Sequence, residues 1–330
     1  MSLPRFLRLI SISIMAFYRE ITTKDDVPLS TLLLEAVTEL ELFNEAPRVI
    51  RETLTQTVNE QTFRVYTGDM TWEELAEGEH ARTGTMDSTE MAFSVKTYGR
   101  SLGYTQEFIE DNEADLIRRH FTKMVEGAME KEHEVIFAVV RNGWANGSNL
   151  WFDPEDFGDY TFDQTHDHSF ADTQELFERN GATDTNAHTP SEHLMELKAE
   201  LEHHGKVADI ALVGFDFARE LLKELSWGAQ YNIPTFESLR ETGYPETGIV
   251  LDGMRVVRSA YLPGMEAHVV AASERPIYFH ERRSVQLTQG QNGGPIGDPG
   301  QLIGSYGSAR YGAVCVDPLA GAKCVADNLA

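Results

Sequence analysis

The longest run of helical periodicity, residues 113–141, limits what this chain can fold into more than any other feature. Asp111, Asn112 and Glu113 supply capping groups and acidic charge at its start, and Asn142-Gly143 ends it. At 1.5 Å per residue the helix is roughly 40 Å long, which is unusual in a compact domain. We therefore expect a structural spine. Its apolar side chains recur at three- and four-residue spacing: Ile117, Phe121, Met124, Val125, Ala128, Val135, Ile136, Val139 and Val140.

The residues before this helix predict two kinds of element. Residues 29–58 have the pattern of a helix in two pieces, interrupted at 44–47, with a first stripe of leucines and valine between Leu32 and Leu42. The capping-box spacing of Thr71–Glu74 predicts a short helix that ends near Gly78. Residues 82–105 alternate in polarity, which predicts a β-hairpin with a mobile tip over 83–89.

The residues after the helix predict an insertion and then a mixed α/β region. Residues 144–190 are acidic, aromatic and irregular, and we expect a long loop there. A helix (191–204), a buried strand (207–215) and a helix that Asp216 caps (217–227) are expected next. Further strands are predicted at 248–257, 268–271, 277–279, 284–287 and 311–316, with a flexible glycine-rich connection at 290–300.

The charge balance is strongly acidic. The chain has 53 Asp and Glu against 28 Lys and Arg, a net charge of -25, and 20 of its basic residues are arginine against 8 lysines. Such a surplus repels itself in ordinary salt, whereas molar salt reduces the screening length to about 3 Å. The pattern favours a salt-loving setting over an ordinary acidic cytosolic protein. Only Arg118-Arg119 and Arg282-Arg283 are densely basic, and we interpret both as local salt-bridge partners rather than a nucleic-acid patch.

The cysteines and the first residues argue against a disulfide-rich protein and against an exported or membrane-spanning one. Cys315 and Cys324 are too few for a disulfide framework, so we expect two reduced, buried thiols. Residues 1–17 resemble a weak signal peptide, but no small-residue cleavage site follows and the apolar run is too short to span a membrane. We expect residues 1–14 to be a flexible arm or the product of a start placed too early, ahead of Met15.

Five stretches in a fixed order resemble the major capsid proteins of tailed phages and archaeal tailed viruses, which share the Hong Kong 97-like fold. Residues 95–111 are similar to the segment that leaves the family's extended loop, and helix 113–141 is similar to its spine helix. The segment 253–264, which contains Leu-Pro-Gly, residues 278–285 and the closing strand 310–320 follow in the family's order. Two features depart from it: the insertion at 144–190, and the absence of a matching acceptor Asn and assisting Glu beside Lys96, so we expect no cross-linking.

The resemblance implies an α+β chain with an N-terminal arm, an extended β-hairpin loop, a peripheral domain carrying the spine helix, and an α/β axial domain. It implies a major capsid protein that self-assembles as pentamers and hexamers into an icosahedral shell around double-stranded DNA, and the charge balance adds the expectation of a halophilic virus. Assembly is expected in the host cytoplasm, with portal and decoration or turret proteins as further partners, and without a membrane, cofactor or catalytic activity. The implied divisions are 1–60 (arm), 61–110 (extended loop), 111–145 with 272–311 (peripheral domain), 146–190 (acidic insertion) and 191–271 with 312–330 (axial domain).

Apolar faces on extended elements predict contacts between subunits. An isolated two-stranded hairpin is marginally stable, so Met91, Phe93 and Val95 are expected to meet a neighbour. The leucine stripe of the arm raises the same problem, which makes Leu33 and Val37 further candidates. Obligate assembly with large interfaces would follow.

Three alternatives stay open. The same fold serves encapsulin-like cellular compartments. In a different class, Asp163, His166 and His168 have the spacing of a zinc or manganese site, which would suit a metal-dependent enzyme, although a solvated loop explains them as well. Residues 153–159 carry several carboxylates that fail the EF-hand pattern, which leaves a non-standard divalent-cation site as the third alternative. No Ser–His–Asp or Cys–His arrangement has supporting context.

Overall fold

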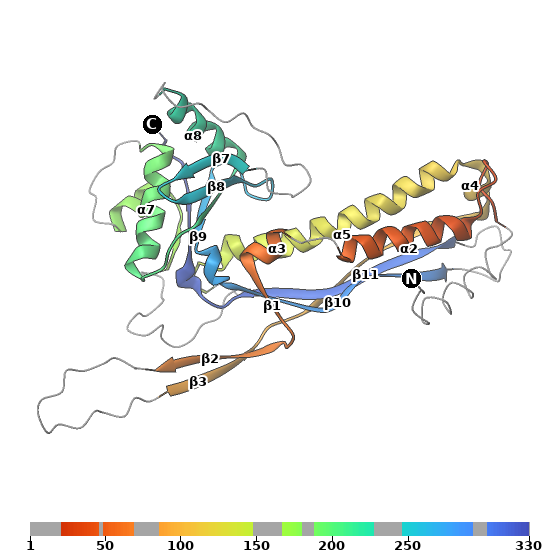
Figure 1. Ribbon diagram of the computed structural model, residues 1–330, viewed down its shortest axis with the longest axis horizontal. Coiled ribbons are helices and arrows are strands. Elements are labelled where there is room, and N and C mark those ends of the chain that lie inside the picture. Colours follow the sequence, from red (N-terminus) through yellow and green to blue (C-terminus); the bar gives the residue numbers. More distant parts are fainter. Residues whose placement is uncertain are drawn as a thin grey trace, which may run out of the picture. The chain divides into compact units, whose positions relative to one another are not determined.

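The computed structural model describes residues 21–45, 49–68, 86–147, 167–179, 188–227, 246–292 and 302–329. The chain divides into two compact units, shown with their elements in Figure 1. Unit 1 comprises residues 1–47, 96–132 and 281–311, and unit 2 comprises residues 48–95, 133–280 and 312–330. One long helix and two long strands continue from one unit into the other.

The described residues form both helices and strands, so the chain is α+β as expected. The helices are α2 (Leu29–Glu45), α3 (Val49–Leu54), α4 (Gln106–Asp111), α5 (Ala114–Asn142), α6 (Thr173–Arg179), α7 (Pro190–His203) and α8 (Phe215–Trp227). The strands are β1 (Thr55–Val58), β2 (Thr62–Gly68), β3 (Met86–Ala92), β4 (Lys96–Tyr104), β5 (Ser169–Phe170), β6 (Ile210–Val213), β7 (Glu246–Leu251), β8 (Met254–Arg258), β9 (Glu266–Val270), β10 (Ile277–Asn292), β11 (Leu302–Cys315) and β12 (Gly321–Val325).

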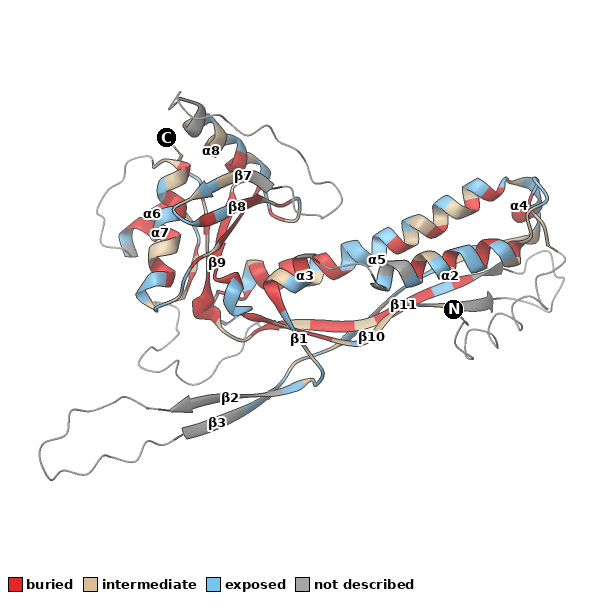
Figure 2. Cartoon of the chain, viewed as in Figure 1, coloured by how far each residue is buried: buried red, intermediate tan, exposed pale blue. Residues whose placement is uncertain are grey.

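Unit 1 packs α2 and the first part of α5 over one apolar core. Leu29, Leu32 and Leu33 of α2 are buried together with Ile117 and Phe121 of α5. Figure 2 shows the buried and exposed residues alternating along both helices, as their apolar periodicity requires. Strand β4 pairs antiparallel with β11, from Ile303 opposite Tyr104 to Tyr311 opposite Lys96.

Two polar contacts fix where the helices of unit 1 begin. The Thr105 hydroxyl accepts a hydrogen bond from the Phe108 backbone N–H and caps α4. The Asp25 carboxylate accepts from the N–H of Ala114, the first residue of α5, at 3.0 Å. The hydrogen bond from Thr23, together with that from Ala114, lowers the pKa of Asp25. Thr105 directly precedes its helix, whereas Asp25 lies 89 positions before Ala114, so the cap seen on α5 is not one of the expected residues Asp111, Asn112 and Glu113.

Unit 2 is built on a six-stranded sheet with the order β5-β12-β9-β6-β8-β7. Strand β9 lies between β12 and β6, antiparallel to both, and all five of its residues are buried. Leucines of α7, including Leu194 and Leu197, and Phe217 of α8 pack into one core with alanines and valines of the sheet. A capping box on Thr189, with Glu192 as its partner, starts α7.

The end of α5 is fixed by close packing in unit 2. A Cβ on Gly143 would lie 2.6 Å from the Val139 carbonyl oxygen and 2.8 Å from Cys315 Cβ, so only glycine fits there. Trp144 follows and is fully buried against Gly321, where a Cβ would come within 2.5 Å of the indole. The long helix therefore ends where the chain enters the core of unit 2.

Several predicted elements are confirmed. The spine helix spans Ala114–Asn142, within one residue of the expected range at each end. The two-piece helix ends at Leu54 rather than at 58, because residues 55–58 form β1 beside β10. Cys315 and Cys324 are free, buried thiols, and burial raises the pKa of both. Within the described residues, no helix is long and apolar enough to cross a membrane.

Other predictions are wrong, for identifiable reasons. Residues 82–105 are not one hairpin: β3 pairs with β2, whereas β4 joins β11, and 93–95 separate them. Period-two alternation reveals a strand but not its partner. Strand β10 is one continuous strand of 16 residues, because the polar residues 280–283 interrupt the apolar pattern and not the strand.

The insertion is also shorter than predicted. Residues 169–179 form β5 and α6, and Phe170, Leu176 and Phe177 lie in the core of unit 2. These elements have two and seven residues, too few to show a period in the sequence. The predicted helix 71–78 and most of the glycine-rich connection at 290–300 lie outside the described residues.

Candidate assembly surfaces and a basic cavity

The hairpin β2–β3 forms a two-stranded sheet that, within the described residues, pairs with no further strand. Its register runs from Thr62 opposite Ala92 to Gly68 opposite Met86, and Figure 1 shows the two strands side by side. At its base, the Phe93 backbone N–H donates to the Gln61 carbonyl at 3.1 Å, and the Phe93 ring meets the His280 ring edge-on at 6.3 Å. The hairpin is anchored at one end and keeps its strand edges open.

The predicted contact residues fall into two groups. Phe93 and Val95 are half-buried at the base of the hairpin, and the side chain of Met91 lies outside the described part of the structure. Leu33 is only 1% exposed and belongs to the core of unit 1, whereas Val37 is half-buried on the same helix. The leucine stripe of α2 is thus covered by the chain's own α5, so the reason for expecting a contact at Leu33 is wrong. Among the described side chains of this helix, the exposed leucine is Leu34.

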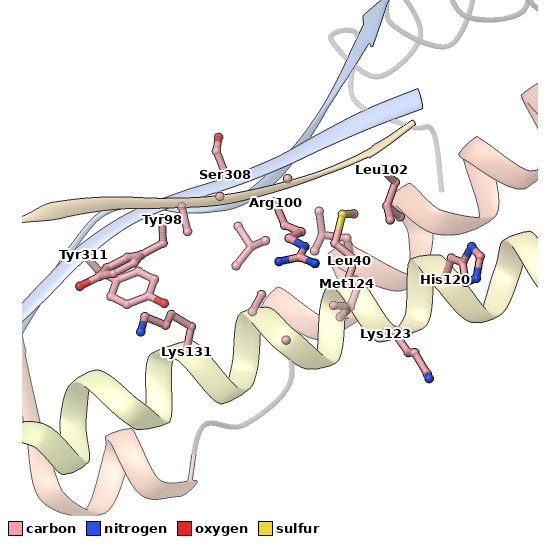
Figure 3. A pocket seen from close by; sticks show the side chains of 17 residues that line it. Leu40, Tyr98, Arg100, Leu102, His120, Lys123, Met124, Lys131, Ser308 and Tyr311 are labelled. Carbon is pink, nitrogen blue, oxygen red and sulfur yellow. The ribbon is translucent and has the colours of Figure 1, made fainter. Parts of the chain in front are cut away.

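A cavity of about 530 Å³ lies inside unit 1, between α5 and the sheet (Figure 3). Small residues line it on both sides: Gly127 and Ala128 on α5, Gly307 and Ala309 on β11. Val285 of β10 and Leu40 of α2 contribute to its lining. The cavity is mostly apolar and opens to solvent.

Basic and aromatic side chains complete this cavity. Figure 3 shows Arg100 pointing from β4 towards α5, beside Leu40 and Met124. The rings of Tyr98 and Tyr311 lie 4.8 Å apart, and Lys131 Nζ lies 5.7 Å from the Tyr98 ring. Burial raises the pKa of Tyr98, so the phenol stays neutral at pH 7. Among the described residues, the lining carries Arg100, Lys123 and Lys131 but no carboxylate, in a chain with a net charge of -25.

A second charged group lies in unit 2 and holds α5 against the sheet. The Arg141 guanidinium donates two hydrogen bonds to the Glu266 carboxylate, at 2.9 and 2.8 Å. A ring nitrogen of the fully buried His268 lies 3.3 Å from the same carboxylate. Burial favours the neutral acid, but the hydrogen bonds from His268 and Arg141 outweigh it and lower the pKa of Glu266 to about 2. Arg141 and His268 thus both bind the Glu266 carboxylate, which is a structural role.

The predicted metal ligands are not brought together by the described part of the structure. Asp163 and His166 lie outside it, as do residues 153–159. His168 is buried, its Nδ1 lies 3.0 Å from the Gly321 carbonyl, and its ring meets that of His204 at 4.9 Å. Within the described residues, no group of three or more His, Cys, Asp and Glu side chains could hold a metal ion.

The two densely basic spots differ from each other. Arg118 binds Glu35 at 2.8 Å and Asp115 at 3.4 Å, as expected of a salt-bridge partner. For Arg282 and Arg283 the described residues show no ion pair, so the interpretation of this spot stays a prediction.

Comparisons with known proteins place this fold among phage proteins. A protein of Mycobacterium phage Patience matches 94% of this chain and 91% of its own, with a TM-score of 0.57 at 15% identity. A protein of Gordonia phage Cozz matches 84% of this chain and 86% of its own, with a TM-score of 0.55 at 14% identity. The capsid structure of cyanophage P-SCSP1u matches 86% and 89%, with a TM-score of 0.53 at 10% identity. No curated protein sequence matches the chain.

These likenesses show that the chain shares its fold with phage proteins. The profile of phage capsid proteins matches residues 88–324, which is well over half of the chain. The chain belongs to this family: it is a major capsid protein, whose copies form the shell of a virion.

Proposed function

We propose that copies of this chain close into pentamers and hexamers, and that these build an icosahedral shell around double-stranded DNA. Head-to-tail contacts that close generate such rings. Assembly takes place in the host cytoplasm, and portal and decoration proteins complete the particle. The chain acts structurally and not as an enzyme.

The observation that carries this proposal is the self-paired hairpin β2–β3. Two strands without a third are marginally stable in water, because half of their backbone groups have no partner strand. A neighbouring subunit would supply the missing contacts. Phe93 and Val95, half-buried at the hairpin base, are the described candidates for this contact, with Met91 at the adjoining end of β3.

The acidic composition supports assembly in concentrated salt. Each of two described lysines serves two carboxylates: Lys206 pairs with Glu274 and Asp317, and Lys198 with Asp252 and Glu202. Such pairs consume the few cations, and the remaining carboxylates repel one another. We propose that the native setting is saline, where a screening length of about 3 Å removes most of this repulsion.

The proposal can be tested by measuring the mass of the particles that the purified protein forms in high salt, and the contents of particles from infected cells. Mass photometry should give particles of hundreds of subunits, and particles from infected cells should contain DNA that resists nuclease. Particles that hold a cargo protein and no DNA would favour an encapsulin-like compartment. A small oligomer under all conditions would contradict shell formation.

The metal-enzyme alternative has its own test. Replacement of His166 and His168 by alanine should leave assembly in place, although His168→Ala removes a buried contact and lowers stability. His166→Ala alone serves as the milder variant. Loss of a metal-dependent activity in the His166 variant would support the alternative.

A further inference from the structure

The cavity of unit 1 and the acidic segment after α5 have matching chemistry. The cavity is mostly apolar, with Arg100 pointing into it and Lys131 beside Tyr98. Neither Arg100 nor Lys123 binds a carboxylate among the described residues. A guanidinium binds carboxylates strongly in a partly dry site and also stacks on aromatic rings. The natural occupant is therefore a peptide segment with aromatic and acidic side chains.

Two segments outside the described residues carry five carboxylates each and no Lys or Arg: 69–79 and 151–163. They differ in apolar content. Residues 69–79 contain one aromatic side chain, Trp72, whereas 151–163 contain five. An apolar cavity of about 530 Å³ gains most from aromatic groups, since these bury the largest areas. The comparison favours 151–163, whose aromatic residues are Trp151, Phe152, Phe157, Tyr160 and Phe162.

The ends of this segment are held together in unit 2. The Asn146 backbone N–H donates to the Asp167 carboxylate at 3.1 Å, and the His168 N–H donates to the Trp144 carbonyl at 3.1 Å. The chain therefore leaves and returns at one place. The 19 residues 148–166 between these points allow a reach of roughly 30 Å from that place, at about 3.3 Å per residue on each side. This length suffices to meet another subunit of a closely packed shell.

We propose that residues 151–163 of one subunit dock into the cavity of unit 1 in a second copy of the chain. Arg100 binds its carboxylates, and the surfaces of Leu40, Met124 and Tyr98 receive its aromatic rings. The proposal rests on the proposed function, because it requires copies that touch in a shell. It gives the acidic insertion a role as a clasp between subunits.

Photo-cross-linking tests this contact directly. Phe157 is replaced by p-benzoylphenylalanine, and shells are assembled from a mixture of ¹⁵N-labelled and unlabelled subunits. The result expected is cross-links from position 157 to residues that line the cavity, in peptide pairs of mixed label. The same probe at Trp72 is the matched control for the other acidic segment. Cross-links within a single subunit, cross-links elsewhere, or cavity cross-links from position 72 instead of 157 would overturn the proposal.

Charge reversal tests the energetics. Arg100→Glu should raise the concentration needed for assembly about tenfold, which corresponds to about 1.4 kcal/mol per subunit. Arg119→Glu makes the same charge change at an exposed position of α5 outside the cavity lining, and should have little effect on assembly. Combining Arg100→Glu with Asp156→Arg should restore assembly, because each interface then regains a pair. Equal thermal unfolding of the unassembled variants shows that folding is intact.

The outcomes separate this inference from the function on which it rests. Wild-type shells together with equal assembly of the Arg100→Glu and Arg119→Glu variants would overturn the clasp alone. A wild-type chain that forms no shells would overturn both.

Discussion

Single residues in this capsid protein act through contacts that sequence patterns do not show. Glu266 is the clearest case, since it lies in a buried strand of apolar neighbours and binds Arg141 and His268. Burying a carboxylate is costly unless charged hydrogen bonds compensate. This cluster fixes the end of the spine helix on the sheet of unit 2. Nothing in the sequence paired Arg141 with a residue 125 positions away.

The Glu266 cluster predicts a specific dependence on pH. The pKa of the Glu266 carboxyl is about 2 in the folded chain, below the ordinary 4.5. The stability that its ionised form contributes is therefore fully present above pH 4.5. That contribution is lost as the pH falls from about 4.5 towards 2. Glu266→Gln should lower the free energy of unfolding by about 1–3 kcal/mol at pH 7. In urea unfolding at pH 2 to 7, the difference between wild type and variant should shrink as the pH falls. A constant difference would contradict this account.

Glycine positions offer a second test at the residue scale. A Cβ on Gly321 would come within 2.5 Å of Trp144, which is fully buried. Gly321→Ala should therefore destabilise the chain by about 1–3 kcal/mol, the usual cost of overpacking a core. On helix α5, a Cβ on Gly127 would meet nothing within 4 Å, so Gly127→Ala should stabilise by about 0.5–1 kcal/mol. Thermal unfolding of both variants measures the contrast, and equal shifts would refute it.

At the scale of elements, α2 and the hairpin have different roles, although the sequence predicted contacts between subunits for both. The apolar stripe of α2 serves the chain's own core, because Leu32 and Leu33 pack with Ile117 and Phe121. The hairpin β2–β3 remains self-paired. Stability and assembly should therefore respond to different substitutions.

A pair of neighbouring leucines separates these roles on α2. Leu33 is 1% exposed and Leu34 is 44% exposed. Leu33→Ala should lower the free energy of unfolding of the unassembled subunit by about 2–5 kcal/mol, as a buried leucine does. Leu34→Ala should change it little. The roles would be reversed if Leu33→Ala impaired only assembly and left the unfolding curve of the subunit unchanged.

The hairpin should show the opposite behaviour. Phe93→Asp places a charge at its half-buried base, which a neighbouring subunit would have to desolvate. We expect the variant to fold, with thermal unfolding within a few degrees of wild type, and to raise the concentration needed for assembly at least about tenfold. Sedimentation of assembled against free subunits measures this. Normal assembly of the variant would show that Phe93 does not lie in an interface between subunits.

Sequence periodicity predicted the elements that are long and regular. The spine helix and helix α7 were found to within about one residue, because a buried face repeats over many turns. The short elements β5, α6 and β12 were missed, as was the partner of each strand. The cavity was also beyond sequence reasoning, because its lining combines residues of α5 with residues of β11, far away in the chain. Single residues far apart in sequence gave no signal of that meeting.

At the scale of the whole molecule, charge sets the conditions for assembly. Copies of a chain with a net charge of -25 repel one another as a shell closes. Ion pairs such as Arg118 with Glu35 offset little of this, since exposed pairs contribute about 0–1 kcal/mol. High salt screens the repulsion and strengthens the burial of apolar contacts between subunits. Assembly should therefore be favoured by salt.

Negative-stain electron microscopy of the purified chain tests the central claim most directly. Images would be taken in about 3 M salt and again after dialysis to about 0.15 M, where the screening length rises to about 8 Å. The account predicts closed angular shells or ring-shaped capsomers in high salt, which come apart on dialysis. A small oligomer of uniform size under both conditions would contradict it.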